Sequence, residues 1–144
     1  MVFKINISHK GKTHKVETEN EGLIGLFIGQ KVKGEEFSTE LSGYELEITG
    51  TSDKAGFPGF VEHSGSQLKR VLLRYGKGMW RMPKGLRKKT TVRRPKGLRL
   101  RKTIRGKEIS ADTVQINTKV LKEGSKKFLD LIPKKEAAPE TATQ

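Results

Sequence analysis

Tyr44-Glu45-Leu46-Glu47-Ile48-Thr49-Gly50 decides the fold class of this 144-residue chain, because its apolar residues alternate with polar ones. Successive side chains of a β-strand point to opposite faces, so the alternation predicts a half-buried strand that ends at Gly50. Similar patterns predict strands in Val2–Ser8, Thr13–Thr18, Leu68–Tyr75 and Val114–Val120, with a hairpin turn at Lys10-Gly11-Lys12. Several short strands separated by glycine predict a mainly β fold, a small barrel-like or sandwich domain with at most one short helix.

The apolar run Leu23–Ile28, flanked by Gly22 and Gly29, is the one candidate helix. We prefer a helix of one to two turns that covers the core, with Asn20 as its N-cap. A buried strand remains the alternative, because periodicity cannot separate the two over so few residues.

The chain has 30 Lys and Arg against 16 Asp and Glu, a formal charge of +14, and no cysteine. The missing cysteines exclude disulfides, thiolate zinc sites and cysteine nucleophiles. No stretch approaches the ~20 apolar residues of a membrane span, and the start of the chain lacks the layout of a signal peptide, so no membrane partner is expected. The length fits one domain, which we expect at residues 1–127, followed by a mostly disordered C-terminal tail at 128–144.

The positive charge is concentrated in residues 66–107, which carry eight Lys, nine Arg and no carboxylate. Residues 1–65 have a net charge of −3, and residues 108–144 have a net charge of zero. Because like charges repel, a folded surface that faces only water normally mixes both signs. The sequence therefore predicts a near-neutral β scaffold that carries a long basic arm, with residues 66–107 as the surface that binds a polyanion.

Nucleic acid is the polyanion that these residues favour. Arginine forks pair bidentately with phosphate oxygens, and Tyr75 and Trp80 offer rings for stacking on unpaired bases. The prolines and glycines of the segment argue against the amphipathic helix of a membrane binder, whereas an acidic protein remains an alternative partner. RNA is favoured over DNA, because no helix suited to a DNA groove is visible. The candidate RNA-binding residues are Arg70, Arg74, Lys77, Arg81, Lys84, Arg87, Lys88, Lys89, Arg93, Arg94, Lys96, Arg99, Arg101, Lys102, Arg105 and Lys107.

Within the basic segment, Pro83-Lys84-Gly85-Leu86-Arg87 recurs as Pro95-Lys96-Gly97-Leu98-Arg99. The proline and glycine positions predict a type I turn in each copy. Beyond the second turn, leucines alternate with Arg99 and Arg101, which places these arginines on one face of a ribbon. Because the segment has many cations and few core-forming residues, the arm is expected to be poorly ordered without its partner.

Catalytic motifs are missing from the sequence. The three histidines, His9, His14 and His63, lack metal-ligand spacing, and no phosphate-binding loop or nucleophile elbow occurs. Glu35 and Glu36 could form a carboxylate pair for metal-assisted RNA cleavage, but adjacent residues of a strand point to opposite faces. We expect no enzymatic activity, no cofactor, no metal site and no small-molecule substrate.

A second motif is the loop Gly50-Thr51-Ser52-Asp53-Lys54-Ala55-Gly56-Phe57-Pro58. Asp53 suits an Asx turn, Gly56 a positive φ, and Pro58 fixes the exit, so the motif alone predicts a tight turn after a strand. Together with Arg93–Gly106 and the strand Val114–Val120, the loop resembles the S-six-e family of archaeal and eukaryotic small-subunit ribosomal proteins, over roughly residues 2–127. The loop residues that carry the resemblance are Gly50, Asp53, Lys54, Gly56, Phe57 and Pro58.

This resemblance implies a non-enzymatic structural constituent of the cytoplasmic ribosome, with small-subunit ribosomal RNA and neighbouring ribosomal proteins as its partners. It implies RNA contacts for Arg93, Arg94, Lys96, Arg99, Arg101, Lys102 and Arg105. The duplicated repeat makes the arm look longer than the family pattern, so roles for Lys84, Arg87, Lys88 and Lys89 rest on charge alone. The neutral tail ending at Gln144 lacks the long basic helix and serine cluster of eukaryotic members, which implies an archaeal-type member. A non-ribosomal RNA- or DNA-binding module or chaperone is the alternative function.

Overall fold

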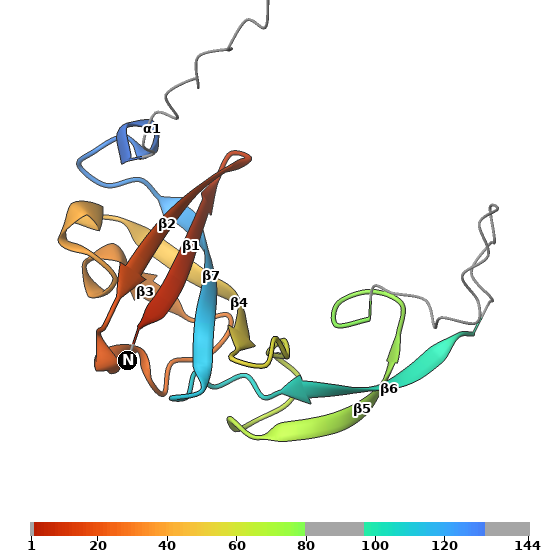
Figure 1. Ribbon diagram of the computed structural model, residues 1–144. Helices are drawn as coiled ribbons and strands as arrows, with labels where there is room; N and C mark the ends of the chain where they lie inside the picture. The colour runs from red at the N-terminus through yellow and green to blue at the C-terminus, as the bar shows by residue number, and fades with distance from the viewer. Residues whose placement is uncertain (1, 80–96, 132–144) are drawn as a thin grey trace, which may run out of the picture.

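The computed structural model describes residues 2–79 and 97–131, which form a five-stranded sheet and a separate two-stranded ribbon (Figure 1). The sheet has the strand order β2-β1-β7-β4-β3, and the ribbon pairs β5 with β6. The strands are β1 (Phe3–His9), β2 (Lys12–Thr18), β3 (Lys31–Lys33), β4 (Glu45–Asp53), β5 (Leu68–Arg74), β6 (Arg99–Arg105) and β7 (Thr113–Lys122). The described helices are the single 3-10 turns η1 (Glu21–Leu23), η2 (Gly34–Glu36) and η3 (Thr39–Leu41), and the short α1 (Phe128–Leu131). The predicted mainly β fold is confirmed.

The hydrophobic core lies on one face of the sheet. Phe3, Ile5 and Ile7 of β1 are fully buried and alternate with more exposed polar residues, as the sequence pattern predicts. Strand β1 pairs antiparallel with β2 and parallel with β7, and β7 pairs antiparallel with β4. Leu46 of β4 and Ile116 of β7 therefore reach the same core, where burial of each such side chain contributes about 1.5–3 kcal/mol.

The predicted hairpin turn connects β1 and β2 with two residues. Lys10 and Gly11 have φ angles of 45° and 79°. Positive φ at both central positions is typical of the type I′ turn, whose twist matches that of the flanking strands. The turn thus fixes the register of the hairpin.

Replacing Gly11 with alanine should lower the free energy of unfolding by about 1–2 kcal/mol, the cost of a left-handed backbone for a residue that carries a Cβ. An added Cβ meets no atom within 4 Å, so no clash adds to this cost. Gly50→Ala is the control, because an added Cβ there also meets no atom and its φ lies outside the left-handed region. Urea unfolding measures both variants, and equal stabilities would contradict the turn assignment.

The predicted helix over Leu23–Ile28 is wrong. Only the single turn η1 forms, and the Asn20 side chain caps it by accepting the Gly22 backbone N–H at 2.9 Å. Gly25 and Gly29 have φ angles of 91° and 95°. These left-handed positions bend the chain away from a helical path, although the run still contributes buried residues to the core.

The predicted end of one strand also differs from the structure. Strand β4 does not end at Gly50, because this glycine sits at a register shift and pairing with β7 continues to Asp53. The predicted domain boundary at residue 127 falls before Phe128, which is 2% exposed and belongs to the core. The remainder of the predicted tail, residues 132–144, and the first copy of the repeat lie outside the described residues.

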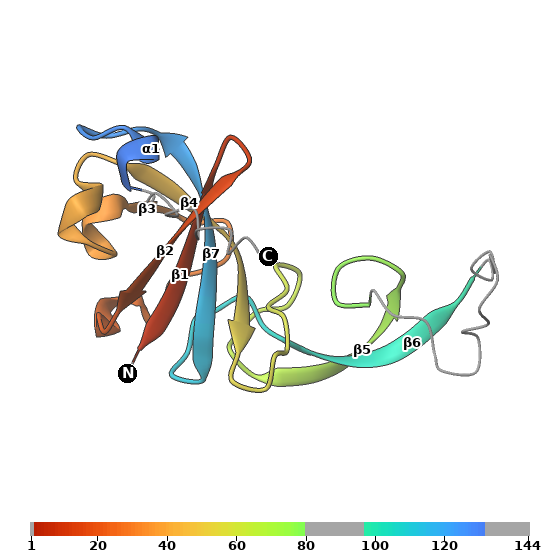
Figure 2. The ribbon, with the colours of Figure 1, turned by 45° about the horizontal axis from the view of Figure 1, so that its top comes forward.

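The ribbon projects from one end of the sheet (Figures 1 and 2). Strands β4 and β7 are direct neighbours in the sheet, so the chain leaves β4, builds the ribbon and returns beside its starting point. The basic segment is therefore an insertion between two neighbouring central strands of the sheet. In the described part of the chain, no helix is long and apolar enough to cross a membrane.

Candidate nucleic-acid interface

The pairing register of the ribbon gathers four exposed arginines on one side. In an antiparallel pair, residues directly opposite each other share a face, and every second residue along a strand returns to that face. Arg74 lies opposite Arg99, Leu72 opposite Arg101, and Arg70 opposite Thr103. We call this side the arginine face, and its four exposed arginines are Arg70, Arg74, Arg99 and Arg101, whereas Arg105 at the base of the same side is buried.

Among the described residues, no acidic side chain neutralises the arginine face. Residues 63–107 contain no carboxylate, and within the described residues none of the four arginines is in an ion pair. Arg74 and Arg99 lie directly opposite each other, a position in which like charges repel. A polyanion on this face would relieve the repulsion, and the guanidinium fork suits phosphate oxygens.

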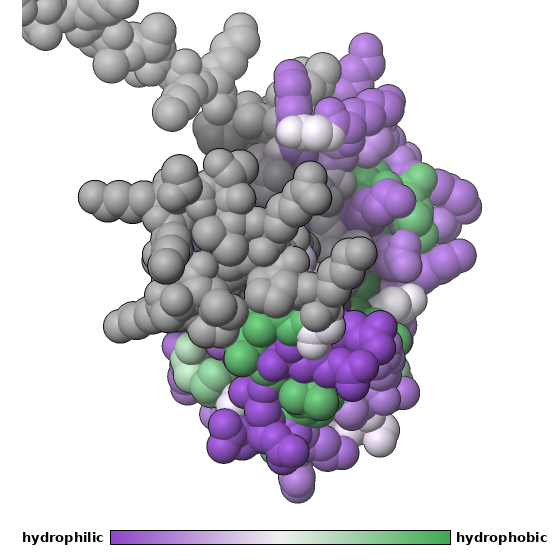
Figure 3. Space-filling model, turned by 90° about the vertical axis from the view of Figure 1, so that its right-hand side faces the viewer, coloured by the Kyte–Doolittle hydropathy of each residue, from purple (hydrophilic) through white to green (hydrophobic). Residues whose placement is uncertain are grey.

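The opposite face of the ribbon is mainly aliphatic and is covered in part by its own chain. It carries Lys69, Val71, Leu73, Leu100, Lys102 and Ile104. The turn Gly76–Met79 folds back here, since a Cβ added at Gly78 would lie 3.1 Å from Leu73 and 3.0 Å from the Phe60 ring. Seen from the side on which the ribbon projects, hydrophilic and hydrophobic residues lie next to each other (Figure 3). The ribbon therefore has one face suited to a polyanion and one suited to packing.

Two predicted RNA-binding lysines lie over aromatic rings. The Lys77 ammonium is 5.4 Å from the centre of the Phe60 ring, and the Lys107 ammonium is 5.2 Å from that of Phe27. Cation–π attraction acts at these distances. Tyr75, predicted to stack on bases, follows β5 and is 37% exposed. The predicted site residues outside the described part of the chain are Trp80, Arg81, Lys84, Arg87, Lys88, Lys89, Arg93, Arg94 and Lys96.

Arg105, the last residue of β6, points into the joint between ribbon and sheet. Its side chain is 11% exposed, with Nε 3.1 Å from Asp53 Oδ2 and Nη2 3.3 Å from Asp112 Oδ2. Nη1 donates to the carbonyl oxygen of Ser66 at 2.9 Å. One guanidinium thus ties together the end of β4, the entry to β5 and the loop before β7.

Asp53 uses both carboxylate oxygens in this joint. Oδ2 accepts from Arg105, and Oδ1 accepts the backbone N–H of Phe57 at 2.8 Å. The second bond closes the predicted motif loop, and Gly56 has the expected positive φ of 84°. Pro58 forms a bridge with Ser52, whereas Lys54 is exposed. The tight turn expected at this motif is present, and its buried aspartate anchors the ribbon.

Backbone packing fixes the same joint. A Cβ at Gly59 would lie 2.2 Å from Thr51 Oγ1, and one at Gly106 would lie 1.8 Å from the carbonyl oxygen of Gly65. The Arg105 N–H donates to the Pro58 carbonyl oxygen at 2.9 Å, and its carbonyl accepts from the backbone N–H of Phe60 at 3.0 Å. The base of the ribbon is therefore held by backbone hydrogen bonds, an ion pair and contacts that only glycine permits.

Arg105 has a different setting from the other predicted RNA-binding residues. Charge and family resemblance placed it with the other cations, but in the structure its guanidinium contacts Asp53, Asp112 and Ser66. Sequence reasoning missed this ion pair because its partners are 52 residues apart. The available signal was an aspartate in the tight loop and an arginine beside Gly106, both within the motifs that carry the resemblance.

The two carboxylates considered for catalysis lie in a 3-10 turn and not in a strand. Glu35 and Glu36 lie in η2, where the Ser42 hydroxyl donates to Glu35 at 3.0 Å. Across residues 2–79 and 97–131, no group of three or more His, Asp or Glu side chains could hold a metal ion. The described part of the chain therefore offers a charged surface for binding, without a cluster of metal ligands.

Comparison with known proteins assigns the family. The family model described as ribosomal protein S6e matches residues 1–95 and 93–133. The chain belongs to the ribosomal protein S6e family. The two matched stretches meet at residues 93–95, where the second copy of the repeat begins.

Similar proteins in archaea cover almost all of the chain. The small ribosomal subunit protein eS6 of Methanococcus maripaludis is 42% identical over 127 residues, which are 87% of this chain and 91% of the relative. The protein of the same name from Methanothermobacter thermautotrophicus is 41% identical over 135 residues, 92% and 96% of the two chains. That of Methanoculleus marisnigri is 34% identical over 143 residues, 96% and 98% of the two chains. The predicted archaeal type of the S6e chain is confirmed.

Proposed function

We propose that this S6e chain is a structural component of the small ribosomal subunit that binds ribosomal RNA through the arginine face of its ribbon. The observation that carries the proposal is the set of four exposed arginines on a projecting ribbon without carboxylates. The relatives are named as proteins of the small ribosomal subunit, which supports this setting. Cytoplasmic ribosomes and neighbouring ribosomal proteins are the corresponding location and partners.

The binding would be mainly electrostatic. Each phosphate that is neutralised by a cation releases counterions, so the logarithm of affinity falls with the logarithm of salt by roughly 0.7–0.9 per contact. Four arginine contacts would thus contribute about 3 to the salt slope, the slope of log affinity against log salt concentration. Phosphate contacts fix position and orientation without reading sequence, which suits a protein that recognises RNA by shape.

The fixed joint at Arg105 sets the angle at which the ribbon presents its arginines to RNA. The ion pair with Asp53 and the close backbone approach at Gly106 hold the base of the ribbon against the sheet. A ribbon held at a set angle loses less conformational freedom on binding than a flexible arm does. The β scaffold therefore positions the arginine face and the arginine face binds RNA.

Sedimentation of an archaeal lysate in sucrose gradients tests the proposed function. An epitope-tagged copy of the chain should travel with the small subunit, remain there after the subunits are separated at low Mg²⁺, and be released by ribonuclease. A chain that stays at the top of the gradient under all three conditions would contradict the proposal and favour a free-standing RNA- or DNA-binding module or chaperone. Purified protein incubated with labelled RNA and Mg²⁺ should leave the RNA intact.

A further inference from the structure

A second group of cations lies at the end of the sheet opposite the ribbon (Figure 1). It draws on three separate elements: the β1–β2 turn, the end of β7, and the segment that follows β7. We call this group the lysine end, and its members, all exposed, are Lys10, Lys119, Lys126 and Lys127. Lys10 is far in the sequence from the other three, so the fold brings the β1–β2 turn to the same end of the sheet as the end of β7.

The backbone beneath two of these lysines is fixed on both sides. Before them, the Ser125 N–H donates to the Ser42 carbonyl oxygen at 3.4 Å. The Tyr44 hydroxyl donates to the Lys126 carbonyl oxygen. After them, Phe128 is 2% exposed and its ring meets His9 edge to face, with ring centres 5.4 Å apart. Lys126 and Lys127 are therefore presented from a fixed segment.

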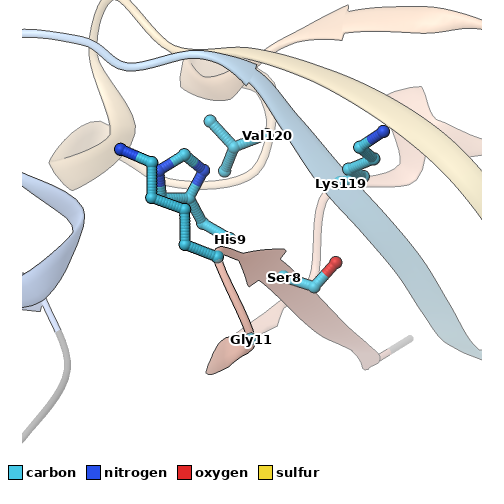
Figure 4. Close-up of a pocket in the computed structure, with 6 residues that line it drawn as sticks. Ser8, His9, Gly11, Lys119 and Val120 are labelled. Atoms are coloured by element: carbon cyan, nitrogen blue, oxygen red, sulfur yellow. The ribbon is translucent and has the colours of Figure 1, made fainter.

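Two hollows that share His9 and Lys10 open at this end. One has a volume of about 360 Å³ and is lined by Ser8, His9, Lys10, Gly11, Lys119 and Val120. The other, about 260 Å³, is lined by His9, Lys10, Glu123, Lys127 and Phe128. In Figure 4 the side chains of His9 and Val120 lie on one side of the first hollow, and those of Ser8 and Lys119 lie on the other. Two lysines line each hollow: Lys10 and Lys119 line the first, and Lys10 and Lys127 line the second.

Positive charge dominates the lining. Among the described residues that line the two hollows, Glu123 is the one carboxylate, and it lies 2.5 Å from His9 Nε2 and 3.6 Å from the Lys10 ammonium. Three lining lysines, Lys10, Lys119 and Lys127, against one glutamate leave a net charge of +2. The bias is local, because the two stretches that contain these lysines, residues 1–65 and 108–144, have net charges of −3 and zero.

We propose that the lysine end binds the phosphate backbone of a second RNA segment, apart from the segment held by the arginine face. This inference rests on the proposed RNA-binding function. Lysine ammonium groups act as compact point charges, and hollows between them can seat single phosphate groups of a folded RNA. With one cationic surface at each end of the sheet, the protein bridges two RNA segments. Binding of RNA at one end then raises the effective concentration of the second RNA segment at the other end.

The test compares two triple variants that lose the same charge. Lys10→Gln, Lys119→Gln and Lys127→Gln remove cations that line the hollows. Lys15→Gln, Lys31→Gln and Lys33→Gln remove exposed cations from the outer strands β2 and β3. Binding to purified archaeal small-subunit ribosomal RNA is followed by fluorescence anisotropy over a salt series, with hydroxyl-radical footprinting of the RNA. Circular dichroism of each variant reports that the fold is kept.

The wild type should protect two separate RNA segments. The lysine-end variant should lose one of them, and its salt slope should fall by about 2–3, whereas the control variant should keep both. Equal losses in the two variants, or an unchanged slope and footprint in the lysine-end variant, would overturn the inference. Capture of an acidic protein by the lysine end with RNA protection unchanged would also overturn it. Failure of the wild type to bind RNA would overturn both the proposed function and this inference. If the wild type binds RNA and only the lysine-end result fails, the proposed function stands and this inference alone is overturned.

Discussion

Replacement of Arg105 with alanine is expected to lower the free energy of unfolding by about 3–5 kcal/mol. The variant leaves the Asp53 carboxylate, whose side chain is 2% exposed, without its cationic partner. It also leaves the Ser66 carbonyl oxygen without the donor that reaches it at 2.9 Å. Removing one member of a buried pair costs far more than removing both, because a buried charge remains uncompensated.

Chemical unfolding in urea measures this effect, and Arg99→Ala is the matched control. Arg99 lies on the same strand, but it is exposed and forms no ion pair within the described residues, so its replacement should change the free energy of unfolding by no more than about 0.5 kcal/mol. Arg105→Lys should be less damaging than Arg105→Ala, since it keeps a positive charge near Asp53. Wild-type stability of Arg105→Ala would refute the structural role of this arginine.

The reason that strands were predictable is visible in β1 and β4. One face of each is buried, so the sequence must alternate, and Ile5 and Leu46 mark that face without any knowledge of the fold. Leu23–Ile28 was not predictable in this way. Its apolar residues suit several backbones, and the φ angles of Gly25 and Gly29 decide among them.

The candidate site also has one part that the local sequence predicts and one part that depends on the fold. The alternation of Arg99 and Arg101 along the ribbon predicts that they share a face, and the structure confirms it. That Arg70 and Arg74 lie on the same face depends on the strand register, which local sequence does not contain. In the sequence, Arg105 does not differ from the other cations of the basic segment. Its role depends on the fold, which places Asp53 beside it, so charge alone could not assign that role.

Replacement of Arg70, Arg74, Arg99 and Arg101 together with glutamine should weaken binding to small-subunit ribosomal RNA on the order of 10²–10³-fold near 0.15 M salt. The four side chains are exposed, so the free energy of unfolding should stay near that of the wild type or rise slightly as the repulsion between Arg74 and Arg99 is removed. Filter binding measures the affinity. Wild-type affinity in the folded variant would mean that RNA is held elsewhere.

The most direct measurement of the central claim compares the two faces of the ribbon at equal charge. Arg70→Gln with Arg101→Gln removes two cations from the arginine face, and Lys69→Gln with Lys102→Gln removes two from the opposite face at neighbouring positions on the same strands. A salt titration of RNA binding should give a slope about 1.4–1.8 shallower for the arginine pair and nearly unchanged for the lysine pair. Equal changes in slope for the two variants would contradict the account, because the ribbon would then act through its total charge and not through one face.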